Sequence, residues 1–204
     1  MEDTLMARQV FVDIDTQHDF ISRDGALSVP GAEEIRGNLE MLTDYAVNNG
    51  IKIVASADAH VPDDKEFEVF PPHCVQNTPG QKKIEETTTA ATVVLKNDAS
   101  ETAQANQIED ADQILLEKQT YDVFTNPSAP GIFEAAGGDE YIVYGVATDY
   151  CVKAAAVGLL ERGYNVTVVK DAIAAVTEQT GKESIALMEE MGAAFKTTQE
   201  VVGG

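Results

Sequence analysis

Cys151 occupies a position that favours chemistry over packing. It closes the stretch "GVATDYC" (145–151), between an apolar run and a predicted helix over residues 152–162. A cysteine is nucleophilic as its thiolate, and both a helix N-terminus and a nearby cation favour that anion. Lys118 ends another predicted strand and could supply the cation, while Asp15 ends a third and could hold the lysine or take the thiol proton. The three side chains predict a nucleophilic thiol site, with a buried inert cysteine as the alternative.

A second group of residues combines imidazole and carboxylate side chains. Asp58 and His60 form "DAH" at the end of a predicted strand, so both side chains can face the same way, and His73 lies in the proline-stiffened loop "FPPHC". Imidazole and carboxylate together suit zinc, iron or manganese, and an incomplete shell leaves room for water or substrate. This group therefore predicts a divalent metal site. The remaining histidine, His18, is more typical of a hydrogen-bonding loop residue, and Cys74 of a packed thiol.

The elements that must position these residues alternate along the chain. Predicted strands cover residues 9–15, 51–58, 111–118, 140–147 and 164–172. Predicted helices cover residues 31–50, 130–136, 152–162 and 181–191. The strands are nearly all apolar, which is typical of a parallel sheet covered by helices on both faces. Sites in such folds collect beyond the carboxyl ends of the strands, where the candidate residues fall, so we expect an α/β protein with three layers (α/β/α), a mainly parallel central sheet and one shared site.

Composition restricts the class of protein. The chain has 204 residues, 44% of them hydrophobic, which suits a single α/β domain over residues 1–204. A formal net charge of −21 argues against nucleic acid and anionic membranes as partners, and no apolar run is long enough to span a bilayer. Two cysteines do not make a disulfide framework, and the N-terminus is too polar for a signal peptide, so we expect a cytoplasmic protein. The pattern is weakest in residues 80–118, where 87–98 could be a strand and 100–112 a helix.

Four stretches resemble the isochorismatase-like cysteine hydrolases, and the nicotinamidase branch is the nearest match. They occur in the family's order, and the resemblance runs from about residue 9 to residue 198. The stretches are "VDIDTQHDF" (12–20), "ADAH…FPPHCVQNTPG" (57–80), "LLEKQTYDVF" (115–124) and "YGVATDYCVKAAAVGLLERGYNVTVVKDA" (144–172). The resemblance implies the isochorismatase-like fold, with an insertion around residues 82–110.

The resemblance implies a catalytic triad of Asp15, Lys118 and Cys151. In the family's D-x-Q-x-D-F pattern the catalytic aspartate lies two residues before the glutamine, which selects Asp15 over Asp13. Lys96 is a rival to Lys118, but it lacks the aromatic stretch that follows Lys118. Asp13 remains an additional charge in a central strand, and the sequence offers no account of it.

The resemblance also implies one divalent metal ion, zinc in the first place, with iron and manganese as alternatives. Its ligands map to Asp58, His60 and His73, whereas a histidine that many members carry between them is missing here. A glutamate fills that role in some members, and Glu66 is the expected additional ligand. Two other acidic residues stay open as alternatives: Asp64 and Glu68. The family's D-W-H is D-A-H in this chain, which removes an aromatic side chain near the metal.

The activity that the resemblance implies is hydrolysis of nicotinamide to nicotinate and ammonia. Cys151 would attack the carboxamide, Asp15 would pass the thiol proton to the departing ammonia, and the N–H groups of Ala147 and Cys151 would form the oxyanion hole. Family members carry a cis peptide bond at that point, which implies a cis Val146–Ala147 bond here. The expected ring-stacking walls are Phe20, Phe70 and Tyr121, with Phe124 as a weaker candidate.

Two alternative functions stay open. The same triad could hydrolyse another small amide or carbamoyl compound, although branches that act on such substrates often lack the metal ligands. A catalytically silent binding protein could keep the same fold, but the intact Asp–Lys–Cys set argues against it. Family members are commonly dimers or tetramers, so the resemblance implies a homo-oligomer that takes a small-molecule amide as its substrate.

Overall fold

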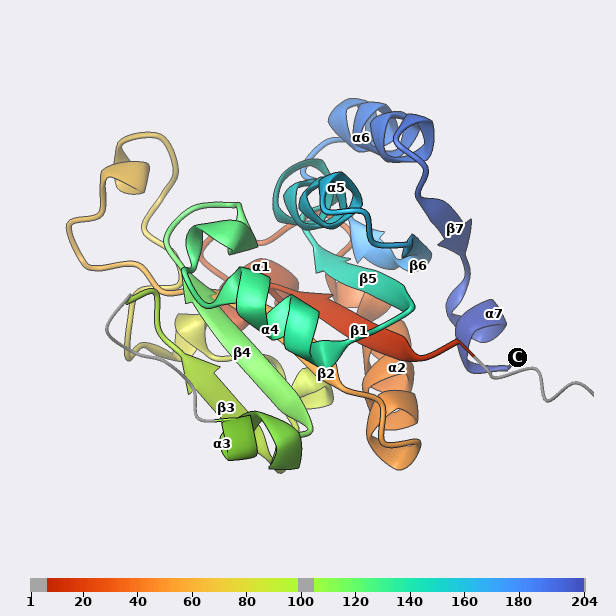
Figure 1. The fold of residues 1–204 in the computed structure, drawn as a ribbon. Coiled ribbons are helices and arrows are strands. Elements are labelled where there is room, and N and C mark those ends of the chain that lie inside the picture. Colours follow the sequence, from red (N-terminus) through yellow and green to blue (C-terminus); the bar gives the residue numbers. More distant parts are fainter. Residues whose placement is uncertain (1–6, 99–104, 204) are drawn as a thin grey trace, which may run out of the picture.

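Seven parallel strands form the central sheet of the computed structural model, which describes residues 7–98 and 105–203. The strand order is β3-β4-β2-β1-β5-β6-β7, and each neighbouring pair in this order runs parallel (Figure 1). The strands are β1 (Gln9–Ile14), β2 (Ile53–Asp58), β3 (Thr92–Leu95), β4 (Gln113–Lys118), β5 (Glu140–Val146), β6 (Val166–Ala174) and β7 (Ala194–Lys196). The predicted parallel sheet is confirmed.

Helices cover both faces of the sheet (Figure 1). They are α1 (His18–Ile21), α2 (Arg36–Asn48), α3 (Ala105–Asp110), α4 (Ala129–Ala136), α5 (Lys153–Glu161), α6 (Glu178–Glu190) and α7 (Thr198–Val202). One buried cluster packs α4, α5 and α6 against the sheet, and a second cluster packs α2 and α7 against the opposite face. The three-layer prediction is therefore confirmed. Among the described residues, no helix has the length and apolarity to cross a bilayer.

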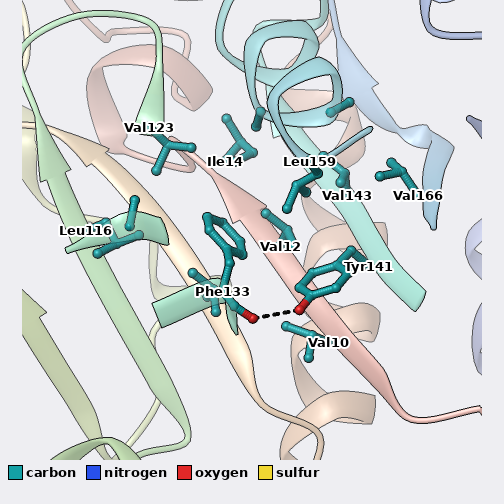
Figure 2. Packing of buried hydrophobic residues seen from close by; sticks show 14 of the residues in the cluster. Val10, Val12, Ile14, Leu116, Val123, Phe133, Tyr141, Val143, Leu159 and Val166 are labelled. Carbon is teal, nitrogen blue, oxygen red and sulfur yellow. Dashed lines mark hydrogen bonds between the residues drawn. The ribbon is translucent and has the colours of Figure 1, made fainter. Parts of the chain in front are cut away.

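The alternation of side chains along β1 divides the core into these two clusters. Val10, Val12 and Ile14 belong to the cluster beneath α4 and α5, whereas Phe11 belongs to the cluster beneath α2. Figure 2 shows the first cluster, in which the Tyr141 hydroxyl donates a hydrogen bond to the carbonyl of Phe133 at 2.6 Å. Because both faces of β1 are buried, this strand can lie at the centre of the sheet.

The structure differs from the sequence-based expectation mainly in short elements. β7 and α7 were not predicted, because three and five residues are too few for periodicity to be read. The capping box formed by Thr197 and Glu200 is the signal that could have located α7. The predicted helix over residues 100–112 is α3, although part of that range lies outside the described residues. The single domain and the insertion around residues 82–110 stay predictions.

Candidate active site and metal centre

The candidate residues lie together because four adjacent strands end at one edge of the sheet. β4, β2, β1 and β5 are neighbours and parallel, so their carboxyl ends point the same way. Lys118 is the last residue of β4 and Asp58 the last residue of β2. Asp15 directly follows β1, and Cys151 follows β5 after a short turn. Residues that are up to 136 positions apart in sequence thereby share one site.

Lys118 is the centre of the buried charge cluster. Its Nζ atom lies 2.7 Å from Asp15 Oδ2 and 3.6 Å from Cys151 Sγ, and it also donates a hydrogen bond to Asp58 Oδ1. Asp15 is held from the other side by the Ser56 hydroxyl, which donates to Oδ1 at 2.6 Å. All of these side chains are buried. The three residues of the predicted triad are therefore in mutual reach, and their catalytic roles stay predictions.

Burial and the two carboxylates set the protonation of this cluster. Burial raises the pKa of the Cys151 thiol well above its ordinary value, and the charge of Lys118 does not offset burial and the repulsion from Asp15 and Asp58. Burial also raises the pKa of Asp15, although the charge of Lys118 lowers it. Burial alone would lower the pKa of Lys118, but its two carboxylate neighbours raise it well above the ordinary lysine value. These shifts favour a neutral thiol at rest beside Asp15, so the thiol must lose its proton as the sulfur attacks.

The backbone around Cys151 departs from a regular helix start. Cys151 lies in a π-helical turn, Thr148–Val152, that precedes α5. The predicted cis peptide bond at Val146–Ala147 is confirmed. Gly145 adopts φ of 115°, and a Cβ atom there would lie 2.0 Å from the carbonyl oxygen of Ile14, so the glycine of "GVATDYC" permits the close approach of β1 and β5. Cys151 thus lies on a specialised turn between strand and helix.

The candidate metal ligands Asp58, His60 and His73 lie together, and their ligand atoms are all within 4.8 Å of one another. This group of three residues is called the metal cluster below. Asp58 Oδ2 lies 3.6 Å from His60 Nε2 and 3.8 Å from His73 Nε2. The Nδ1 atoms of the two rings are engaged elsewhere, by the Asp64 carboxylate at 3.0 Å and the Pro71 carbonyl at 2.8 Å. These outer contacts leave both Nε2 atoms beside Asp58 Oδ2, where the three residues could hold one metal ion.

One atom of this cluster lacks a hydrogen-bond partner in the part of the chain that the structure describes, and a metal ion could take that place. His60 Nε2 is buried and has no hydrogen-bond partner among the described residues. An unpaired polar atom in the interior is costly, and coordination of a cation would satisfy it. Two imidazoles and one carboxylate are a donor set that zinc, iron and manganese accept. The residues present therefore fit a divalent metal ion.

The expected additional ligand, Glu66, lies beside this cluster. Among the described residues, the close set of ligand atoms comprises Asp58, His60 and His73 and does not include Glu66. Glu66 instead lines a pocket that also reaches Asp58 and His73. Burial raises the pKa of Glu66, as does the negative charge of Asp58. The two alternatives to Glu66 differ in their surroundings. Asp64 contacts His60 Nδ1 and accepts from the Glu66 N–H, whereas Glu68 is exposed at the surface. The assignment of Glu66 stays a prediction.

A pocket with about 100 Å³ of interior space lies between the two clusters. Its lining includes Asp58, Glu66, His73, Ala147 and Cys151, together with the three predicted aromatic walls Phe20, Phe70 and Tyr121. Sequence reasoning missed Tyr150, whose ring lies 6.1 Å from that of Phe70 and 6.5 Å from that of Tyr121. Phe124, the weaker candidate, instead packs against Phe133 in the core. The thiol and the candidate metal ligands Asp58 and His73 thus face one small, mainly apolar pocket.

Comparison with known proteins assigns the chain. The model of the isochorismatase domain matches residues 9–200. The chain belongs to the isochorismatase family. A nicotinamidase from Escherichia coli (strain K12) is 29% identical to this isochorismatase-family protein over 216 residues, covering 90% of this chain and 91% of the relative. An Arabidopsis thaliana relative described as a probable inactive nicotinamidase is 24% identical over 188 residues, covering 92% of this chain and 91% of the relative.

A solved structure shows the same fold. The crystal structure of a pyrazinamidase from Pyrococcus horikoshii in complex with zinc superposes with a TM-score of 0.78 at 24% identity, covering 93% of this chain and 99% of that one. The similarity confirms the isochorismatase-like architecture of the sheet and its helices. The family is one of hydrolases, and the substrate of this isochorismatase-family protein is treated below as a proposal.

The missing aromatic residue of D-A-H has a structural counterpart in this family member. The Phe67 ring lies 5.3 Å from the His60 ring and 5.7 Å from the His73 ring. Phe67 comes from a 3₁₀ turn, Lys65–Glu68, rather than from the end of β2. Its signal in the sequence is a single aromatic residue within the acidic stretch "DDKEFE". Packing of this ring restricts the orientation of both imidazoles.

Asp13, for which the sequence offered no account, is a fully buried partner of a second lysine. Lys83 Nζ donates to Asp13 Oδ2, and the Thr16 hydroxyl donates to Asp13 Oδ1 at 2.8 Å. Lys83 is also within 2.9 Å of Thr16 Oγ1. Because the charge is paired and hydrogen-bonded, it can be accommodated inside the sheet. The rival lysine Lys96 is exposed after the edge strand β3.

Proposed function

We propose that this isochorismatase-family protein is a nicotinamidase, a metal-assisted cysteine hydrolase that converts nicotinamide to nicotinate and ammonia. The observation that carries the proposal is the position of Lys118, which contacts Asp15, Cys151 and the metal-cluster residue Asp58. This arrangement joins a nucleophile, a base and a metal cluster at one pocket. The nicotinamidase relative supports the choice of substrate. Composition and resemblance extend the proposal to a cytoplasmic homo-oligomer.

Acylation begins from the neutral thiol. Asp15 takes the proton of Cys151 as Sγ attacks the carboxamide carbon, and a tetrahedral adduct forms. Ala147 and Cys151 both line the pocket, and their N–H groups are assigned to stabilise the negative oxygen. Asp15 then gives the proton to the amide nitrogen, the C–N bond breaks and ammonia leaves. The product of this half-reaction is a thioester between Cys151 and the nicotinoyl group.

Deacylation repeats the same proton transfers with water. Asp15 removes a proton from a water molecule that attacks the thioester carbon, and the C–S bond then breaks. The thiolate of Cys151 recovers its proton from Asp15, and the carboxylic acid formed loses its remaining proton to solvent and leaves as nicotinate. Lys118 remains protonated throughout, because its two carboxylate neighbours hold its pKa well above the ordinary value. Its role is to keep Asp15 oriented and to offset negative charge near the thiol.

The metal cluster and the aromatic walls are assigned to substrate binding. Asp58, His60 and His73 would hold zinc, iron or manganese, with Glu66 as the additional ligand. When bound, the metal supplies a Lewis acid for the pyridine nitrogen and thereby orients the ring. The ring-stacking walls are Phe20, Phe70 and Tyr121. Such anchoring raises the rate by fixing the carboxamide near Sγ rather than by taking part in the acyl chemistry.

Purified protein is expected to release equimolar ammonia and nicotinate from nicotinamide, and chelation is expected to reduce this turnover strongly until Zn²⁺ is returned. The loss should appear both as a higher KM and as a lower kcat, since an unanchored ring misplaces the carboxamide. Benzamide, which lacks the ring nitrogen, should be a poor substrate with or without metal. Coupled ammonia assays and chromatography of nicotinate measure these outcomes. Full activity in protein that metal analysis shows to be metal-free would contradict the proposed anchoring.

Matched variants test the ligand set and the alternatives. Glu66→Ala is expected to weaken Zn²⁺ binding, whereas Glu68→Ala, an exposed residue on the same 3₁₀ turn, should leave it unchanged. Normal metal binding by Glu66→Ala would remove that residue from the ligand set. Turnover of another small amide or carbamoyl compound in place of nicotinamide would establish the alternative hydrolase. Absence of turnover on every amide tried, in folded and metal-loaded protein, would favour the silent binding protein.

The decrease of kcat/KM at low pH is expected to follow the protonation of Asp15. Because burial raises the pKa of this carboxyl, the base becomes protonated, and kcat/KM falls, at a pH above the ordinary aspartate value of about 3.9. The decrease approaches tenfold per pH unit below the pKa. The measurement is kcat/KM against pH, with metal content determined at each pH so that ligand protonation is separated from the base. A flat profile down to the ordinary aspartate range would contradict the role of Asp15.

A further inference from the structure

Gln17 is a fully buried polar residue. Its side chain contacts the main chain of Asp58, one of the candidate metal ligands. The Gln17 Oε1 atom accepts a hydrogen bond from the Asp58 N–H at 2.7 Å, and its Nε2 atom donates to the Asp58 carbonyl at 2.8 Å. Nε2 also donates to the carbonyl of Gln81 at 2.6 Å. One carboxamide therefore satisfies both main-chain groups at the last residue of β2.

These hydrogen bonds continue the sheet where β1 ends. The pairing of β1 with β2 reaches Ile14 opposite Ser56, and the last main-chain bond runs from Asp15 N–H to the Ser56 carbonyl at 3.2 Å. Asp15 then turns away with φ of 50°, which leaves the β1 side of Asp58 without a strand partner. The Gln17 side chain donates and accepts there as a neighbouring strand would. On the opposite side, Asp58 remains paired with β4.

The carboxylate that this main chain carries serves two clusters at once. Asp58 Oδ1 accepts from Lys118, while Oδ2 faces the Nε2 atoms of both histidines. A small displacement of the Asp58 main chain would therefore disturb both contacts together. We infer that Gln17 is a positioning residue that holds Asp58 between the metal cluster and Lys118. The inference rests on the proposed function for its catalytic consequence, but its effect on metal affinity does not.

Gln17 is itself held rigidly enough to act in this way. Its segment forms an antiparallel bridge with Lys83, in which His18 N–H donates to the Lys82 carbonyl at 2.8 Å and Ile84 N–H donates to the Thr16 carbonyl at 2.9 Å. The carboxamide is thus oriented by the main chain on one side and by Gln81 on the other. Outer residues of this kind commonly change metal affinity about 10-fold to 100-fold when removed.

The test compares two buried glutamines. Gln17→Met keeps the length of the side chain and removes its hydrogen bonds, and Gln113→Met makes the same change at a fully buried glutamine at the opposite end of β4 from Lys118. Affinity for Zn²⁺ alone is measured by competition with a chromophoric chelator, and nicotinamide turnover separately. Gln17→Met is expected to lose about 10-fold or more in Zn²⁺ affinity and to lower kcat. Gln113→Met is expected to change neither by more than about threefold on the same scale.

A second variant keeps the inference testable if Gln17→Met does not fold. Protonated Gln17→Glu can still donate to the Asp58 carbonyl and accept from the Asp58 N–H, so its Zn²⁺ affinity relative to the native chain should improve as the pH falls. The Gln113→Met control, which removes a buried glutamine away from the candidate metal ligands, separates this effect from a general loss of packing. Native Zn²⁺ affinity in Gln17→Met, an equal loss in Gln113→Met, or a loss in Gln17→Glu that persists where its carboxyl is protonated would overturn the inference. Failure of the proposed function would appear instead as native protein that binds Zn²⁺ but releases no ammonia.

Discussion

Replacement of Cys151 by alanine is expected to abolish nicotinamide hydrolysis while the protein still folds. The thiol lies 3.6 Å from Lys118 Nζ and is hydrogen-bonded to Asp15, so its removal deletes the atom that attacks the amide. Loss of a nucleophile of this kind lowers kcat by about 10⁴-fold or more. Ammonia release measures the effect, and thermal unfolding confirms that the variant is folded. Ordinary turnover by Cys151→Ala would exclude the thiol mechanism.

Two further variants make this result specific. Cys74→Ala removes the second thiol of the chain, which is buried and whose Sγ lies 3.8 Å from the Gly80 carbonyl, and it should retain most activity. Cys151→Ser keeps a hydroxyl at the site but should lose nearly all turnover, because the triad is arranged for a thiol. An aldehyde analogue of nicotinamide should trap native protein as a thiohemiacetal and fail to trap Cys151→Ala. Substantial metal-dependent turnover by Cys151→Ser would assign the chemistry elsewhere.

Replacement of Lys118 by methionine is expected to reduce both stability and turnover. The change leaves the buried carboxylates of Asp15 and Asp58 without their shared cation, and breaking a buried ion pair costs about 3–5 kcal/mol in the free energy of unfolding. Without the cation, burial and repulsion from Asp58 hold the pKa of Asp15 still further above its ordinary value. The variant should therefore regain stability as the pH falls and lose it as the pH rises. Denaturant unfolding of metal-free protein at several pH values measures this.

Lys83→Met is the matched control for that experiment. Lys83 also pairs with a buried aspartate, Asp13, but this pair lies outside the pocket and involves a single carboxylate. We expect Lys83→Met to lose stability while its folded fraction keeps most of its turnover. Lys118→Met should lose turnover in its folded fraction as well, since Asp15 is no longer oriented beside the thiol. Equal turnover per folded molecule in the two variants would contradict the role assigned to Lys118.

The placement of the main site residues could be predicted because it follows from sheet topology. Apolar runs identify strands, and parallel strands end at one edge, so Asp15, Lys118 and Cys151 had to lie at the same side of the molecule. The contacts of Phe67 and Tyr150 could not be read in this way, since they depend on how loops pack against one another. The partner of Asp13 was equally hidden, because Lys83 lies 70 residues away in sequence.

Protonation was the other property that sequence could not supply. The position of Cys151 after a strand suggested a thiolate, but the pKa depends on burial and on how many charges surround the sulfur. The sequence could not decide which acidic residue is the additional metal ligand, and the reason is geometric. Asp64 precedes a 3₁₀ turn; its Oδ1 atom accepts from the Glu66 N–H and its Oδ2 atom contacts His60 Nδ1, on the far side of the ring from Nε2. Spacing alone does not distinguish these orientations.

The strand order has a consequence for the moment at which the site is assembled. β1 lies where the chain divides: β2, β4 and β3 extend to one side of it, and β5, β6 and β7 to the other. Lys118 and the metal cluster therefore belong to the portion of the chain made first, whereas Cys151 belongs to the portion made last. A nascent chain that ends before β5 carries Lys118 and the candidate metal ligands but not Cys151. The proposed nucleophile therefore joins the rest of the site only through the pairing of β5 with β1.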